Sequence, residues 1–143
     1  MSINNISPNE WGPSAWRFMH YITMAYPDNP TTIDKQNMKT FFSSIGSILP
    51  CEKCRINFAK HTSVYPLNDY VLNSRFDLVN WLIDVHNEVN KMNGKKVLSY
   101  DEVIQLYLYK QHDNCLIVNT RTAVIIVSLV IIIVLVIIMK CIN

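Results

Sequence analysis

The residues from Thr122 to Met139 form a run of 18 uncharged, mostly apolar residues with Arg121 before it and Lys140 after it. As a helix this run would be about 27 Å long, just enough to cross the hydrocarbon core of a bilayer. Its Val and Ile content would also suit a buried strand. The length of the run and the cation at each end favour a membrane span, so we expect residues 121–140 to be a transmembrane helix.

No segment near the N-terminus resembles a secretory signal, because residues 1–11 have neither a positively charged start nor an apolar stretch. With three residues after Lys140, the apolar run would leave the ribosome only after synthesis ends. This is typical of a tail-anchored protein. We therefore expect a single-pass C-terminal anchor with its domain on the cytosolic face, and a lumenal domain is the alternative. The flanking charges do not determine the orientation of the span, since Arg121 and Lys140 balance across it.

Outside the span the charges are balanced. Apart from Arg121 and Lys140, the chain carries 11 basic and 11 acidic residues and no Lys/Arg-rich block. A protein that binds nucleic acid by neutralising phosphates needs a basic surface, so we expect no nucleic-acid partner. The three glycines are isolated, which excludes the two common glycine-rich phosphate loops. A nucleotide would have to be held in another way.

Residues 1–120 have helical periodicity almost throughout, so we expect an all-α domain of five helices. Ser7 to Glu10 has the form of a capping box, but Pro13 would clash inside a helix that started there. We therefore expect the first helix to begin near Pro13. Further N-cap residues, prolines and Gly94 determine the expected boundaries of the other helices. The expected helices cover residues 13–25, 31–49, 51–61, 74–94 and 100–110.

Two apolar stripes run along the fourth expected helix, so we expect it to be nearly buried. One stripe consists of Phe76, Val79, Ile83, His86 and Asn90, and the other of Leu78, Leu82, Val85 and Val89. His86 and Asn90 are polar groups among apolar neighbours, and they need a hydrogen-bonding partner. Trp16 and His20 have the same spacing on the first helix. Each of these residues alone is typical of ordinary packing.

Cys51 and Cys54 follow a proline and open a helix. A helix N-terminus stabilises a thiolate, and two cysteines three residues apart can close a disulfide across one turn, so the pair suits thiol–disulfide exchange. Half of a zinc site is one alternative, but His61 supplies at most one more ligand. An inert pair of buried cysteines is another. A thioredoxin-like fold would need strands that this chain lacks.

Three motifs occur in order along the chain: Trp11-Gly12-Pro13 with Trp16 and His20; Pro50-Cys51-x-x-Cys54; and His86-Asn87-x-Val89-Asn90 with Gly94-Lys95. Together they resemble the signature of the Erv/ALR family of FAD-linked sulfhydryl oxidases, over about residues 9–110. The short forms encoded by large DNA viruses are the most similar. Such a protein would lie in a host-cell or virion membrane.

The resemblance implies a four-helix bundle plus a short fifth helix that binds FAD non-covalently, commonly as a homodimer. Together with the apolar run, it leads us to expect a domain over residues 1–110, a linker over 111–120, the span over 121–140 and a tail over 141–143. No metal site is implied. The implied FAD-binding residues are Trp11, Gly12, Trp16, His20, His86, Asn87, Val89, Asn90, Lys95 and Tyr107.

The implied activity is thiol oxidation. A substrate thiolate attacks Cys51, a second substrate thiol resolves the mixed disulfide, and Cys54 passes the electrons to FAD and then to oxygen, which gives hydrogen peroxide. The implied partners are protein dithiols, either a thioredoxin-like carrier or membrane-bound virion proteins. A full bilayer would separate Cys115 from Cys141, so they cannot bridge within one chain; we expect both to be inert, and lipidation or an intermolecular disulfide is the alternative. The alternative function is a membrane-anchored adaptor that keeps the fold without catalysis.

Overall fold

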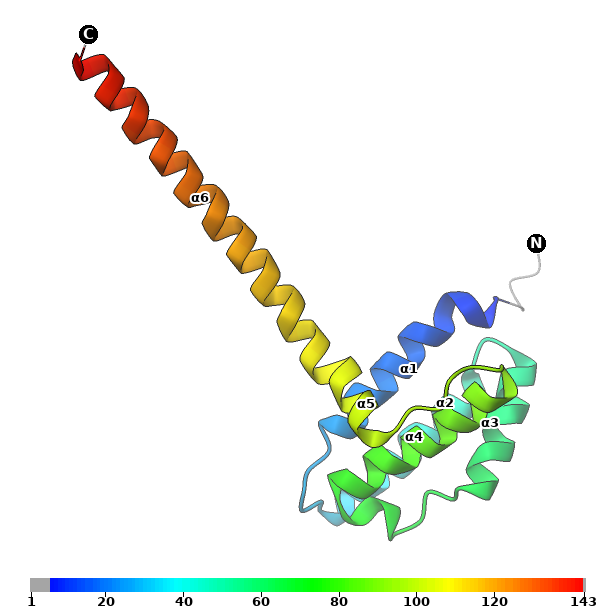
Figure 1. The fold of residues 1–143 in the computed structure, drawn as a ribbon. Coiled ribbons are helices and arrows are strands. Elements are labelled where there is room, and N and C mark those ends of the chain that lie inside the picture. Colours follow the sequence, from blue (N-terminus) through cyan, green and yellow to red (C-terminus); the bar gives the residue numbers. More distant parts are fainter. Residues whose placement is uncertain (1–5, 143) are drawn as a thin grey trace. The chain divides into compact units, whose positions relative to one another are not determined.

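The computed structural model describes the backbone of residues 6–142 and the side chains of residues 6–109, 122–135 and 137–139. All regular secondary structure in residues 6–142 is helical, as expected from the sequence (Figure 1). The chain divides into two compact units between Val103 and Ile104, and each is described by itself. The helices are α1 (Pro8–Met24), α2 (Thr32–Ile48), α3 (Glu52–Val64), η1 (Val71–Asn73), α4 (Arg75–Met92), α5 (Tyr100–Ile104), η2 (Gln105–Tyr109) and α6 (Lys110–Ile142).

The first unit is a bundle in which α1 packs against α4, α2 against α3, and α3 against α4. Side-chain caps fix the starts of its helices. Thr31 and Asp34 form a reciprocal capping box at α2, and the Ser74 hydroxyl accepts the N–H of Asp77 at α4. Helix α4 ends before Gly94, which has the positive φ of 64° that glycine adopts without strain.

The expected start of the first helix was wrong. Helix α1 begins at Pro8 with Ser7 as its N-cap, and Pro13 lies inside it. Pro8 is well suited to the first helical position, because its missing N–H would have had no partner there. Pro13 removes the hydrogen bond to the carbonyl of Asn9. Both residues are exposed, so water can satisfy that carbonyl.

Other boundaries also differ from the expectation. Helix α3 continues to Val64, three residues beyond His61, and the short helix η1 was not predicted. The expected fifth helix changes from α5 to the π-helical turn η2 and then continues as α6, so residues 111–120 are helical. A π-helical turn places one extra residue in the turn and leaves no distinctive hydrophobic period.

The core of the first unit lies between α1, α2, α3 and α4. Leu72, Leu78, Leu82 and Val85 are completely shielded from solvent, and the rings of Phe42 and Trp81 meet edge to face with centroids 4.7 Å apart. Gly46 on α2 allows a close approach of α3, since a Cβ there would lie 2.7 Å from the Phe58 ring. Helix α4 is largely buried as expected, but Phe76 at its start is 60% exposed.

Helix α6 of the second unit contains one stretch, Thr122–Met139, that is long and apolar enough to cross a membrane. Every side chain described in this stretch is exposed. The side chains of Cys115 and Cys141, and Asn143 at the end of the expected tail, lie outside the described residues.

Candidate active site

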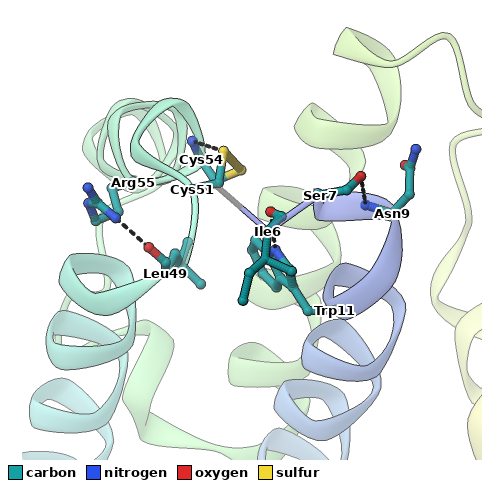
Figure 2. The surroundings of a disulfide bond; sticks show 8 residues. All are labelled: Ile6, Ser7, Asn9, Trp11, Leu49, Cys51, Cys54 and Arg55. Atoms are coloured by element: carbon teal, nitrogen blue, oxygen red, sulfur yellow. Dashed lines mark hydrogen bonds between the residues drawn. A yellow bond between two sulfur atoms is a disulfide. The ribbon is translucent and has the colours of Figure 1, made fainter. Parts of the chain in front are cut away.

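Cys51 and Cys54 form a disulfide where α3 begins (Figure 2). Cys51 is the N-cap residue, and its Sγ accepts a hydrogen bond from the backbone N–H of Cys54 at 3.2 Å. Their Cα atoms are 5.1 Å apart, within the normal range for a disulfide. The free N–H groups of a helix N-terminus stabilise a thiolate, so the pair lies where thiol–disulfide exchange is favoured.

Arg55 fixes the link between α2 and the cysteine pair. Its guanidinium Nη1 donates to the carbonyl of Leu49 at 2.5 Å, two residues before Cys51 (Figure 2). Arg55 was not among the predicted site residues. Its charge alone was no specific signal, because Lys53 in the same turn is also a cation and is exposed.

The disulfide is only partly accessible. Cys51 is 8% exposed, and Cys54 is half-buried. The segment that leads into α1, with Ile6 and Trp11, lies beside the pair (Figure 2). The indole Nε1 of Trp11 donates to the carbonyl of Ile6 at 3.3 Å, which holds this segment against the start of the helix. Trp11, one of the predicted site residues, is therefore close to the redox pair.

Three rings from α1 and α4 form a cluster. Trp16 and His86 stack with centroids 3.9 Å apart and an angle of 3° between their planes. Nε2 of His20 lies 3.0 Å from Nδ1 of His86, a hydrogen-bond distance. Three of the predicted site residues are thus brought together across the contact between two helices.

Both histidines of this cluster are uncharged at neutral pH. Burial lowers the pKa of His20 to about 3, and the neighbouring His86 adds to the effect. Burial also lowers the pKa of His86 to about 4, with a further contribution from the charge of Lys95. Because each neutral imidazole has one donor and one acceptor nitrogen, one ring donates to the other. The cluster is therefore neutral, with Trp16 and His86 parallel and the His20 ring tilted by 39° to both.

The remaining predicted residues of α4 have different surroundings. Asn87 is 8% exposed, and its amide is engaged by the backbone of Leu98 through two hydrogen bonds, of 2.8 and 3.0 Å. Asn90 is also 8% exposed, and its carbonyl accepts the N–H of Lys95 at 2.8 Å. Val89 is half-buried, whereas Lys95 is exposed.

The space beside Gly12 shows whether a flat cofactor fits next to this ring cluster. The residue is buried, yet a Cβ built on it would meet no atom within 4 Å. Gly12 lies one helical turn before Trp16, on the same face of α1. Space beside a buried backbone and a flat ring surface are compatible with an isoalloxazine or adenine ring, so these residues fit FAD.

Tyr107 is the predicted site residue that belongs to the second unit. It lies in η2 and is buried. Among the side chains that the structure describes, no group of three or more His, Cys, Asp or Glu could hold a metal ion.

Comparison with known proteins decides the family. Residues 13–113 match the Erv1/Alr family. The chain belongs to the Erv1/Alr family. It is 52% identical over 100 residues to a probable FAD-linked sulfhydryl oxidase of Acanthamoeba polyphaga mimivirus, covering 70% of each protein. It is 31% identical over 97 residues to the FAD-linked sulfhydryl oxidase of African swine fever virus (isolate Pig/Kenya/KEN-50/1950), covering 68% of this chain and 79% of that protein.

The structural comparison agrees with this assignment. The crystal structure of the FAD-binding domain of Erv1 from Saccharomyces cerevisiae matches with a TM-score of 0.66 and 27% identity, covering 71% of this chain and 94% of that one. The Erv1/Alr resemblance and the helical fold that it implied are therefore confirmed.

Proposed function

We propose that this Erv1/Alr protein is an FAD-linked sulfhydryl oxidase that forms disulfides in protein substrates through Cys51 and Cys54. The observation that carries the proposal is the position of the pair: a disulfide at a helix N-terminus, in the same bundle as a neutral ring cluster that fits a flat cofactor. The relatives named above are FAD-linked sulfhydryl oxidases. An adaptor without catalysis is not favoured, because it would require neither feature.

The residues that would hold FAD lie mainly on α1 and α4. Gly12 leaves room for a ring beside the backbone, and the stacked Trp16 and His86 provide a rigid wall. Asn90 offers a buried side-chain amide, and the exposed Lys95 offers a charge for a phosphate. Further contacts are proposed for the remaining predicted residues: Trp11, His20, Asn87, Val89 and Tyr107.

The protein's own chemistry is thiol–disulfide exchange. A substrate thiolate attacks Sγ of Cys51, which forms a mixed disulfide and releases the sulfur of Cys54 as a thiolate. A second substrate thiolate then attacks the substrate sulfur of the mixed disulfide. This step forms the substrate disulfide and leaves Cys51 as a thiolate, which the N–H of Cys54 can stabilise.

The two reduced cysteines must then be reoxidised. FAD held by the residues of α1 and α4 would supply a two-electron acceptor for Cys54, so that the Cys51–Cys54 disulfide could re-form, and oxygen would take up the electrons as hydrogen peroxide. The neutral His20–His86 pair adds no positive charge of its own at neutral pH.

We also propose that the exposed apolar stretch of α6 anchors the protein in a host-cell or virion membrane as a single pass. The domain would face the cytosol and act as a homodimer. Its substrates would be protein dithiols, either a thioredoxin-like carrier or membrane-bound virion proteins. Selective contact with such a substrate would limit wasteful oxidation of cytosolic thiols.

The test uses the full chain purified in detergent. We expect a yellow protein with bound FAD that consumes oxygen when a dithiol is added. Cys51→Ser and Cys54→Ser should each retain the flavin spectrum and lose turnover, whereas Cys115→Ser and Cys141→Ser should remain active. A folded, colourless protein that does not take up added FAD would contradict the proposal, and loss of turnover in Cys115→Ser would reveal a shuttle cysteine.

A further inference from the structure

A pocket of about 400 Å³ opens on a face of the first unit that the redox chemistry does not use. It is formed by the end of α3, the loop that carries η1 and the first half of α4. Four aromatic side chains and two carboxylates dominate its lining. They are Tyr65, Tyr70, Phe76, Trp81, Asp77 and Asp84.

The pocket lies away from the ring cluster and from the disulfide. On α4, the lining residues Asp77, Trp81 and Asp84 follow one face of the helix, while His86 and Asn90 lie on the opposite face. Helix α3 separates the pocket from the redox pair, since Val64 lines the pocket and Cys51 caps the other end. Thirteen residues of helix correspond to about 20 Å, so an occupant would not block Cys51.

The aromatic rings are partly fixed and partly accessible. The buried indole of Trp81 donates to the carbonyl of Tyr65 at 2.7 Å, and the hydroxyl of Tyr65 donates to Glu88 at 3.3 Å. By contrast, Tyr70 is 72% exposed and Phe76 is 60% exposed. Rings that are held at one side and open at the other can receive a group that projects from another molecule.

The carboxylates of Asp77 and Asp84 differ in whether they already have a hydrogen-bonding partner. Asp77 accepts the hydroxyl of Ser74 at 2.6 Å as part of the cap of α4. Asp84 makes no hydrogen bond or ion pair with the side chains that the structure describes, and nearby Lys91 is paired with Glu88 at 2.7 Å. The Asp84 side chain is exposed; desolvation by its neighbours raises the pKa of its carboxyl, and the charge of Lys91 opposes that shift.

We propose that this pocket binds the cationic side chain of an arginine or lysine presented by a partner protein. Aromatic faces attract a cation through their quadrupoles, and the carboxylate of Asp84 supplies the matching charge. An apolar group would leave Asp84 more buried and still unpaired, and an anion would be repelled. The inference does not depend on the proposed oxidase activity.

The test measures binding to the full FAD-loaded chain in detergent micelles by NMR, at low ionic strength. The probe is the peptide acetyl-Gly-Ser-Arg-Ser-Gly-amide, and its citrulline analogue has the same shape without the charge. We expect a saturable shift of the indole N–H signal of Trp81, with no shift at Trp11 or Trp16. The citrulline peptide should bind about fivefold more weakly.

Matched variants identify the groups responsible. Asp84→Asn should weaken binding of the arginine peptide about fivefold, whereas Asp101→Asn, which removes an exposed carboxylate outside the pocket, should leave it unchanged. Tyr70→Leu, which keeps an apolar group and removes the ring, should also weaken binding severalfold. The proposal is overturned if the arginine peptide causes no saturable shift, if the citrulline peptide binds equally well, or if both pocket variants bind like the original chain.

Discussion

The rings of Trp16 and His86 stack face to face, with centroids 3.9 Å apart and planes 3° from parallel. This contact joins α1 to α4 beside the proposed FAD site. It makes the histidine ring part of a rigid surface, since His86 is also held by His20 at 3.0 Å. We expect the rigidity of this ring surface to determine FAD affinity more than any single contact to the cofactor does.

Trp16→Leu should therefore remove the stacking contact with His86 while keeping an apolar side chain in the bundle. An aromatic stacking contact contributes about 1 kcal/mol beyond the area it buries, so we expect FAD to bind about five- to tenfold more weakly. The measurement is the ratio of flavin to protein absorbance after dialysis, together with titration of FAD into the apoprotein. Equal affinity in Trp16→Leu and the original chain would show that the stack plays no part in binding.

The two histidines should make the fold sensitive to mild acid. Their pKa values in the folded protein, about 3 and about 4, lie below the ordinary value of 6.5, so the unfolded chain binds more protons below pH 6.5. The stabilisation is complete above pH 6.5 and is lost as the pH falls towards 4. At pH 5 the loss is about 2 kcal/mol for each histidine.

Thermal unfolding of the apoprotein at pH 7.5 and pH 5 measures this effect. The Tm of the original chain should fall between these values, and the fall should be smaller in His86→Gln, which has one buried imidazole fewer to protonate. An equal fall in both proteins would assign the acid sensitivity to other groups.

Gly46 should tolerate no side chain. In Gly46→Ala the new Cβ would lie 2.7 Å from Cδ1 of Phe58, a ring that is only 6% exposed. The overpacking costs about 1–3 kcal/mol, more than the gain of about 1 kcal/mol in helix propensity, so we expect a lower Tm.

Gly12→Ala is the matched comparison, because its Cβ would meet no protein atom within 4 Å. This variant should keep or raise the Tm of the apoprotein and weaken FAD binding. If Gly46→Ala were as stable as the original chain, the contact between α2 and α3 would be less tight than the structure has it.

Asn87 should stabilise the segment after α4. Its amide makes two hydrogen bonds with the backbone of Leu98, so Asn87→Ala should cost about 2 kcal/mol and leave two backbone groups without their partner. Amide hydrogen exchange at Leu98 should become faster, while exchange in α2 should change only with global stability. Unchanged exchange at Leu98 would mean that other contacts hold this segment.

The stretch Thr122–Met139 should retain the full chain in membranes after alkaline carbonate washing. Ile131→Arg places a charge at its centre and costs about 2.5–3.5 kcal/mol, which should release a substantial fraction of the protein, whereas Ser128→Ala should release none. Protease treatment of intact vesicles tests the expected cytosolic orientation. Protection of the domain until detergent is added would reverse that assignment.

Local signals in the sequence predicted much of the fold. Thr31 and Ser74 marked helix starts because a hydroxyl that accepts a helix N–H acts within a few residues. Pro13 was misleading, since whether a proline interrupts a helix depends on whether water reaches the freed carbonyl. The family signature indicated the ring cluster, but the stack of Trp16 on His86 depends on how α1 meets α4.

The pocket around Asp84 could not be predicted for a similar reason. Its lining comes from three elements, and no local pattern connects Tyr65 and Tyr70 with α4. Asp84 itself is an ordinary acidic residue on a helix. Only the packing of the bundle shows that it lines a pocket and has no hydrogen bond or ion pair with the described side chains.

Because the N–H of Cys54 donates to the sulfur of Cys51, that sulfur also serves as the N-cap of α3. A thiolate accepts this bond at least as well as a disulfide sulfur does, so the first turn of α3 can stay wound in both oxidation states. A serine at position 51 can preserve the cap and remove only the chemistry, whereas an alanine removes both. Chemical and architectural losses at this position can therefore be separated by changing one atom.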